Sequence, residues 1–314
     1  MKIFITGACG YQGTKFVPIL LSKGYKVVSL DTEWFGNRLP KHKNLVHLKK
    51  NLLDINKQDL KDVDLIVHLS SIANDPMGDL KQHKTWEFSC LATMKLLELA
   101  IYKKIKKIIY ASSASVYGIK KEKLVTECLK LEPISTYNKA KMITERILVS
   151  YSDKINITII RPATVCGLSE RMRFDLSVNM LTYQAIVNKK ITVFGGNQIR
   201  PNIHIDDLLD VYQFFFSNNK NLNGIFNAGF ENISILQIAK MVSKFIDCKI
   251  KVFKNSNDPR SYRVDSSKLL KLGYEPKKNV EIAIQEIIKK YKNEKKFDPR
   301  SFSVNWLKEK HKKF

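Results

Sequence analysis

The fold of this 314-residue chain is decided by residues 2–13, KIFITGACGYQG. The first half of the segment is a short apolar run that predicts a buried strand. The second half carries three glycines at regular spacing: Gly7, Gly10 and Gly13. An apolar-periodic helix is predicted after the last glycine, followed by a second strand that ends at Asp31. A strand, a glycine-rich turn, a helix and a strand that ends in an acid form the βαβ unit that binds a dinucleotide.

The glycine turn explains how the chain would hold such a ligand. Glycines allow a tight turn and let backbone amides, including those of Tyr11 and Gln12, approach a pyrophosphate at the helix N-terminus. Asp31 is placed to accept hydrogen bonds from ribose hydroxyls. Because its negative charge would repel a 2′-phosphate, the pattern predicts NAD rather than NADP as the cofactor.

Strands and helices alternate through the first half of the chain. Further strands are predicted over 45–48, 64–69, 107–111 and 158–160. A helix is predicted between the first two of these strands, and a long helix over 80–102. The alternation predicts an α/β fold, a Rossmann-type doubly wound parallel sheet with helices on both faces and ligands at the carboxyl ends of its strands.

The regular alternation ends after Pro162, where loops, shorter strands and isolated helices follow. We expect this part to form a smaller, discontinuous substrate-binding domain. The NAD-binding domain is predicted over 1–165, with 205–230 and roughly 263–275 returning to it. The substrate-binding domain is predicted over 166–204, 231–262 and 276–314.

The composition argues against several classes of protein. The formal net charge of +24 would suit nucleic acid, but the lysines are scattered and no nucleic-acid-binding motif accompanies them. No apolar run is long enough to span a membrane, and no signal peptide precedes the first strand. The five cysteines show neither metal-ligand spacing nor a disulfide framework. We therefore expect a cytoplasmic protein with no nucleic-acid partner, no membrane insertion and no metal.

Tyr137 and Lys141 lie four residues apart in a predicted helix, so their side chains share one face. A free phenol ionises near pH 10, and an ammonium held one turn away is expected to lower the pKa of Tyr137. The phenol could then take a proton from a substrate hydroxyl. The same spacing also occurs on ordinary helix faces, so this reading depends on the other motifs of the chain.

Those motifs occur together along most of the sequence: Thr6-Gly7-x-x-Gly10-x-x-Gly13, Asp31, Val67-His68-Leu69-Ser70-Ser71, Ser112-Ser113, Tyr137-x-x-x-Lys141 and Arg161-Pro162-Ala163-Thr164. In combination they resemble the extended short-chain dehydrogenase/reductases. The subgroup that the chain is similar to is the NAD-dependent nucleotide-sugar epimerases and dehydratases. The resemblance implies an enzyme that binds NAD and acts on a nucleoside-diphosphate sugar.

The resemblance also implies a role for each site residue. In the family, the serine that matches Ser113 donates to the substrate oxygen, the Tyr137 phenolate accepts the hydroxyl proton, and Lys141 contacts the nicotinamide ribose. The residues implied to bind the cofactor are Gly7, Gly10, Tyr11, Gln12, Gly13, Asp31, Asn51, Leu52, Leu69, Ser70, Ser71, Ser112, Tyr137, Lys141 and Pro162.

Residue 115 distinguishes the reactions of this family. Dehydratases and decarboxylases carry Glu there, whereas this chain carries Ala114 and Ser115, which offer no acid or base. The resemblance therefore implies oxidation at C4 of the sugar, with 4-epimerisation for surface-polysaccharide biosynthesis as the favoured outcome. One alternative is net 4-dehydrogenation that releases a 4-keto sugar, because the run 171–176 resembles GDP-heptose 4-dehydrogenases. Another is a non-catalytic NAD-sensing or RNA-binding protein with the same fold.

The resemblance places further residues at the sugar nucleotide: Ser115 and Cys166 beside the sugar, Arg171 and Arg173 near the phosphates or the sugar, Asn179, Arg200 and Arg260 at the diphosphate, and Phe194 against the base. It also implies a homodimer, because relatives pair the two helices expected here over 80–102 and 134–150. The apolar positions expected at that contact are Met94, Leu97, Ile143 and Ile147.

Overall fold

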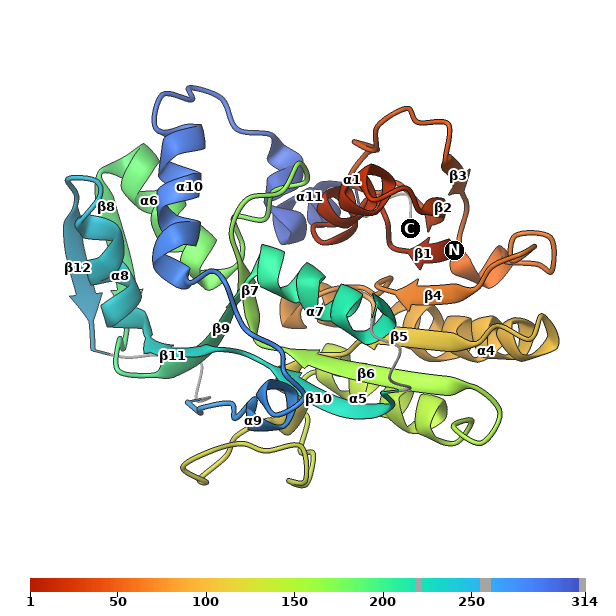
Figure 1. The fold of residues 1–314 in the computed structure, drawn as a ribbon. Helices are drawn as coiled ribbons and strands as arrows, with labels where there is room; N and C mark the ends of the chain where they lie inside the picture. Colours follow the sequence, from red (N-terminus) through yellow and green to blue (C-terminus); the bar gives the residue numbers. More distant parts are fainter. Residues whose placement is uncertain (218–221, 255–260, 311–314) are drawn as a thin grey trace.

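The computed structural model describes residues 1–217, 222–254 and 261–310 (Figure 1). Its largest element is a parallel sheet of seven strands in the order β10-β6-β5-β4-β1-β2-β3. The strands are β1 (Lys2–Thr6), β2 (Lys26–Asp31), β3 (Leu45–Lys49), β4 (Leu65–His68), β5 (Lys107–Ala111), β6 (Asn156–Pro162) and β10 (Gly224–Ala228). The strand order reverses at β1, so the predicted Rossmann-type doubly wound sheet is confirmed.

Helices cover both faces of this sheet, because its strands present apolar side chains to both sides. Ile3 and Ile5 of β1 belong to the core under α1 (Gly13–Ser22) and α7 (Ile205–Ser217). Phe4 points the other way, into the core under α4 (Ala92–Tyr102) and α5 (Thr136–Val149). The single strand thus shows the period of two that separates the two cores.

Two helix predictions differ from the structure. The helix expected between β3 and β4 is wrong: this segment holds only a 3₁₀ turn, Leu52–Asp54. The side chains of Asn51, Asn56 and Asp59 accept hydrogen bonds from nearby backbone amides and so compete with helix formation. The long helix expected over 80–102 is divided into α3 (Gln82–Trp86), a π-helical turn (Glu87–Leu91) and α4, after a separate α2 (Asp75–Leu80).

In the smaller part of the molecule, the described residues form two short sheets with helices packed beside them. One sheet has the order β11-β9-β7 and the other pairs β12 with β8. Their strands are β7 (Thr164–Cys166), β8 (Lys190–Phe194), β9 (Ile199–His204), β11 (Glu231–Ser234) and β12 (Lys249–Phe253). The helices that pack beside them are α6 (Ser177–Asn188), α8 (Ile235–Ser243) and α10 (Val280–Tyr291), while the short α9 (Ser267–Leu270) contacts β10.

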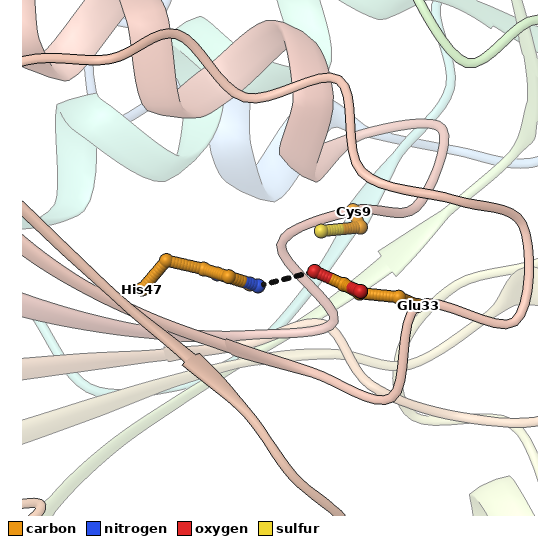
Figure 2. Close-up of side chains that lie close together, drawn as sticks. All are labelled: Cys9, Glu33 and His47. Carbon is orange, nitrogen blue, oxygen red and sulfur yellow. Dashed lines mark hydrogen bonds and ion pairs between the residues drawn. The ribbon is translucent and has the colours of Figure 1, made fainter.

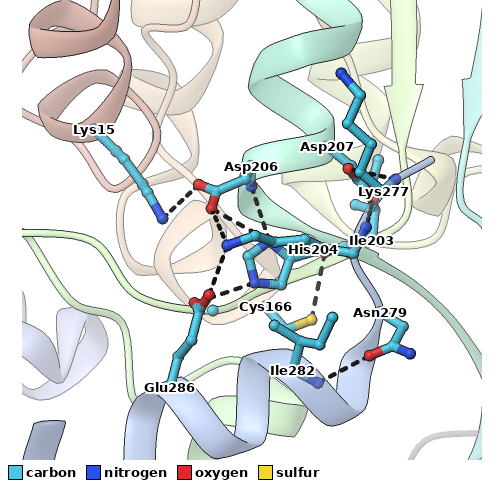
Figure 3. Close-up of polar contacts among 12 residues, drawn as sticks. Lys15, Cys166, Ile203, His204, Asp206, Asp207, Lys277, Asn279, Ile282 and Glu286 are labelled. Atoms are coloured by element: carbon cyan, nitrogen blue, oxygen red, sulfur yellow. Dashed lines mark hydrogen bonds and ion pairs between the residues drawn. The ribbon is translucent and has the colours of Figure 1, made fainter. Parts of the chain in front are cut away.

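An ion-pair network joins the two parts of the molecule (Figure 3). Asp206 at the start of α7 pairs with Lys15 of α1 and with Lys278, 2.8 Å away. Lys278 also reaches Glu286 of α10 at 2.6 Å. The buried His204 lies between these carboxylates, and burial lowers its pKa to about 4. Two lysines therefore balance the acidic groups at this junction.

The last helix, α11 (Ser303–Lys310), leaves the smaller part and packs against α2. The sequence analysis assigned residues 276–314, which include α11, to the substrate-binding domain, whereas α2 lies in the segment assigned to the NAD-binding domain.

Among the described residues, no helix is long and apolar enough to cross a membrane.

Candidate active site and cofactor cavity

A cavity of about 550 Å³ runs along the carboxyl ends of the central strands. It extends from Asp31 and the glycine turn to Tyr137, and on to Arg200 of the smaller part. The walls bring together most of the residues expected from the sequence: Gly7, Gly10, Tyr11, Gln12, Asp31, Asn51, Leu52, Leu69, Ser70, Ser71, Ser112, Ser113, Ser115, Tyr137, Pro162, Arg171, Arg173 and Arg200.

The glycine turn can pack this tightly against the neighbouring backbone only because its glycines lack side chains. Gly7 has a φ of +70°, and a Cβ there would lie 2.7 Å from the backbone nitrogen of Ser70. Gly13 lies behind the cavity wall, where a Cβ would come within 2.5 Å of the carbonyl oxygen of Ala8. Gly10 is part of the wall itself. The turn therefore forms a backbone cradle at the N-terminus of α1, which fits a pyrophosphate.

An acidic group lies beside the glycine turn, at the end of β2. The carboxylate of Asp31 accepts hydrogen bonds from the backbone amides of Cys9, at 2.9 Å, and Glu33, at 2.7 Å. Burial raises the pKa of Asp31 despite these bonds. Figure 2 shows the thiol of Cys9 beside Glu33 and His47. Nε2 of His47 lies 3.1 Å from Oε1 of Glu33. The carboxylate of Asp31 in the cavity wall suits ribose hydroxyls and disfavours a 2′-phosphate.

Tyr137 and Lys141 lie on α5, which begins at an N-cap. The side chain of Ser135 accepts a hydrogen bond from the amide of Asn138, and the helix places Tyr137 in the cavity wall. Tyr137 is hydrogen-bonded to Ser113 at the end of β5. Lys141 lies behind the wall, 2% exposed, and its ammonium donates to the carbonyl of Ala111 at 2.6 Å.

The expected effect of Lys141 on Tyr137 is absent from this structure. Burial raises the pKa of Tyr137 to about 12, and the hydrogen bond from Ser113 offsets only part of that rise. The ammonium of Lys141 lies 5.9 Å from the centre of the phenol ring, and burial lowers its own pKa to about 7. The prediction of a lowered phenol pKa is therefore wrong for the protein alone, because the lysine is directed to a backbone carbonyl.

Asp75 is a cavity residue that the sequence reasoning missed. Its Oδ1 accepts hydrogen bonds from the hydroxyl of Ser135 at 2.5 Å and from the side-chain amide nitrogen of Asn138 at 2.8 Å. The Oδ1 of Asn138 in turn accepts from Ser115, 2.5 Å away, whose hydroxyl contacts Ser113 at 2.7 Å. A hydrogen-bonded chain therefore links Asp75 to the serine beside Tyr137. The available signal was the turn after β4, because loops at this edge of a parallel sheet carry ligands.

The arginines of the cavity differ in their partners. Arg173 forms a two-point ion pair with Asp175, at 3.0 and 2.7 Å, and Asp175 also accepts from Asn74. Arg171 donates to Ser303 at 2.7 Å. Arg200 lies in the wall near the smaller part. Arg260, also expected to bind the substrate, lies outside the described residues.

Three residues expected at the substrate do not line this cavity: Cys166, Asn179 and Phe194. The thiol of Cys166 is fully buried and donates to the carbonyl of Ile203 at 3.5 Å. Asn179 is also buried, and its amide bonds the backbone of Gly167 and of Arg173. Phe194 is 57% exposed on β8 and stacks on Phe253, because the paired strands β8 and β12 present their aromatic residues on one surface.

Comparison with known proteins agrees with this geometry. Residues 3–229 match the family model described as the NAD dependent epimerase/dehydratase family. A UDP-glucose 4-epimerase of Lactobacillus helveticus is 27% identical, covering 94% of this chain and 98% of its own length. An uncharacterized UDP-glucose epimerase of Bacillus subtilis, YtcB, is 30% identical over 88% of this chain and 93% of its own.

The fold agrees as well. The crystal structure of UDP-glucuronic acid 4-epimerase from Bacillus cereus, in complex with UDP-glucuronic acid and NAD, superposes with a TM-score of 0.82 at 28% identity. That comparison covers 93% of this chain and all of the other. Because the family model spans the glycine turn, the serine and tyrosine of the cavity and every strand of the central sheet, this chain belongs to the NAD dependent epimerase/dehydratase family of enzymes.

Proposed function

We propose that this enzyme is a nucleoside-diphosphate-sugar 4-epimerase whose first candidate substrates are UDP-sugars. The observation that carries the proposal is the hydrogen-bonded pair of Ser113 and Tyr137 in one wall of the cavity. Such a pair can hold a sugar hydroxyl and accept its proton. The relatives support the choice of substrate: their names describe two UDP-glucose epimerases and one UDP-glucuronic acid 4-epimerase.

Tyr137 is the group that takes the proton from the sugar hydroxyl and later returns it. Ser113 donates to the same oxygen and keeps it within reach of the phenol. NAD bound along the glycine turn would supply the hydride acceptor and donor, and the positive charge of its oxidised ring would favour ionisation of a nearby phenol such as Tyr137. Because the pKa of Tyr137 is about 12 without that charge, the phenol is protonated in the cofactor-free enzyme at neutral pH.

The surroundings of Ser115 support epimerisation over elimination of water. The hydroxyl of Ser115 is bonded to Asn138 and Ser113, and neither it nor Ala114 can move a proton at C5 or C6 of the sugar. Asp75 holds Ser135 and Asn138 through one oxygen, so it keeps α2 and α5 together beside the reacting groups. The hydroxyl chain therefore positions a substrate for redox chemistry at one carbon.

The test is to incubate the enzyme, without added NAD, with UDP-glucose, UDP-galactose, UDP-N-acetylglucosamine and UDP-glucuronic acid, and with GDP-, CDP- and dTDP-hexoses. NMR follows the sugar and absorbance follows NADH. Conversion to the C4 epimer without lasting NADH supports the proposal. Stoichiometric NADH with a released 4-keto sugar would show net dehydrogenation and contradict it.

Two tyrosine variants separate chemistry from folding in this test. Tyr137→Phe should lose conversion while it keeps the fold. Tyr102→Phe is the matched control, because Tyr102 is 63% exposed and lies outside the cavity walls. Equal activity of the two variants would remove Tyr137 from the mechanism.

A further inference from the structure

The segment after α10 returns to the cofactor side of the molecule. Asp298 pairs with Arg38, and the indole of Trp306 donates to the carbonyl of Trp34 at 2.9 Å. Leu307 of α11 is 5% exposed and packs with Trp34 and Phe35, the residues that follow Asp31, and with α2. In Figure 1, α11 (blue) appears next to α1 (red) in this view, although the two helices lie at opposite ends of the chain.

This segment forms part of the cavity wall. Ser303 and Val304 of α11 line the same cavity as the glycine turn, together with Trp34 and Phe35. Ser303 is 1% exposed, so it faces the interior rather than solvent. A ligand that filled the cavity from the glycine turn could therefore also meet the start of α11.

Ser303 holds a buried arginine at this place. Arg171 is 3% exposed, donates from Nη2 to Ser303 at 2.7 Å, and stacks 3.9 Å above the ring of Phe35. The backbone amide of Arg171 donates to the hydroxyl of Thr14, in the first turn of α1. The side chain thus lies in the cavity wall near the helix N-terminus at which the glycine turn ends.

The guanidinium of Arg171 has hydrogen-bonding capacity left over. Its buried Nε has no hydrogen-bond partner, and no carboxylate pairs with Arg171 among the described residues. Burial lowers the pKa of Arg171 to about 9. A buried cation that has no anionic partner is costly, and the N-terminus of a helix beside it attracts the same kind of ligand, an anion. The diphosphate of the cofactor meets both requirements, since a guanidinium matches phosphate geometry.

We propose that α11 is part of the cofactor site: Ser303 is a positioning residue that keeps Arg171 on the diphosphate of NAD, and α11 closes the cavity over the cofactor. Arg171 is then a cofactor residue rather than a sugar-nucleotide residue. The proposal rests on the proposed function only in taking NAD as the ligand. Its consequence is slow release of NAD, which keeps the cofactor in place between the two halves of an epimerisation.

The test measures binding of NAD and of UDP separately, by calorimetry, and release of NADH by fluorescence. Ser303→Ala should weaken NAD binding about tenfold, the scale of one hydrogen bond to a charged group, and leave the affinity for UDP unchanged. Ser303→Thr keeps the hydroxyl and should restore the affinity. Ser243→Ala, at the end of α8 and outside the cavity walls, is the matched control.

Two further variants test Arg171 and the helix directly. Arg171→Gln should weaken NAD binding more than Ser303→Ala does, and a chain that ends at Phe302 should release NADH faster. If the shortened chain does not fold, the point variants decide. Unchanged NAD affinity in Ser303→Ala and Arg171→Gln, or a loss confined to UDP, would overturn the proposal. Because these measurements use no sugar turnover, they remain informative even if the enzyme epimerises none of the sugars tested.

Discussion

Glu145→Gln should destabilise the protein strongly, because Glu145 and Arg161 form a buried ion pair directly behind the active site. Their side chains are 2% and 3% exposed. Arg161 donates from Nε at 3.0 Å and from Nη2 at 2.6 Å to the two oxygens of Glu145. Ser112, next to Ser113 of the cavity wall, donates to the same carboxylate. The pair thus ties β5 and β6 to α5 beside the cavity wall that holds Ser113 and Tyr137.

The expected loss can be estimated from this geometry. Breaking a buried pair from one side leaves an uncompensated charge and costs about 3–5 kcal/mol. Since glutamine retains the shape and one acceptor, we expect the lower end, about 3 kcal/mol. That is a large part of an ordinary free energy of unfolding of about 5–15 kcal/mol. The loss of negative charge near Lys141 should also lower the pKa of that lysine further, because Glu145 raises it in the native protein.

Urea denaturation followed by circular dichroism measures the free energy of unfolding. Glu87→Gln is the control, because the Lys84–Glu87 pair is about one-third exposed and such surface pairs contribute about 0–1 kcal/mol. A double variant, Glu145→Leu with Arg161→Met, should recover stability, since replacing a whole buried pair by apolar groups is often neutral. A loss below about 1 kcal/mol in Glu145→Gln, or a double variant as unstable as the single one, would refute the electrostatic explanation.

The other predictions concern catalysis, the cofactor, assembly and pH. Tyr137→Phe should reduce the turnover rate about 10²–10⁴-fold with an unchanged circular dichroism spectrum, and a drop below about tenfold would contradict its role as the base. Asp31→Ala combined with Glu33→Arg should shift the affinity from NAD toward NADP, as calorimetry with both cofactors would show; equal NADP binding by the native enzyme would show that Asp31 is not the discriminating residue. We also predict a homodimer through α4 and α5, and Met94→Glu should make it monomeric in light scattering, since Met94 is 37% exposed. A native monomer at micromolar concentration would contradict that. His68 is fully buried with a pKa lowered to about 3, so it stays neutral in the folded state while the unfolded chain takes up a proton below about pH 6.5. The stability that neutral His68 contributes is therefore present above pH 6.5, and the free energy of unfolding should fall by about 2 kcal/mol at pH 5. Urea denaturation at the two pH values measures this fall. If His68→Gln shows the same fall, another group is responsible for the pH dependence.

The sequence predicted the features that depend on short segments. The spacing of the glycines, the acid at the end of β2 and the four-residue spacing of Tyr137 and Lys141 are local patterns, and each local pattern has a fixed consequence for geometry. The parallel sheet followed from the alternation of strands and helices. Even the interrupted region after Pro162 was visible as a change in that alternation.

The features that the sequence did not predict depend on contacts between distant segments. Asp75 meets α5 through Ser135 and Asn138, some sixty residues later in the chain. The ammonium of Lys141 is directed to Ala111 on a neighbouring strand rather than to the phenol one turn away. At the expected dimer contact, Leu97 is fully buried in the core of its own chain, because that face of α4 packs on the central sheet. Spacing along a helix shows which residues share a face but not what that face meets.

The choice between epimerisation and net dehydrogenation now depends on how the enzyme treats its cofactor. Cys166, which was expected beside the sugar, does not line the cavity, and its buried thiol donates to the carbonyl of Ile203, so it does not distinguish the two reactions. What differs between the two reactions is the fate of the hydride: an epimerase returns it to the same sugar, whereas a dehydrogenase must exchange or reoxidise NADH. If Arg171 and Ser303 hold the cofactor as proposed, slow exchange of NAD would favour return of the hydride to the same sugar. Slow NADH release together with 4-epimerisation would support both the proposed reaction and the proposed role of α11. Rapid NADH release from the native enzyme would favour dehydrogenation.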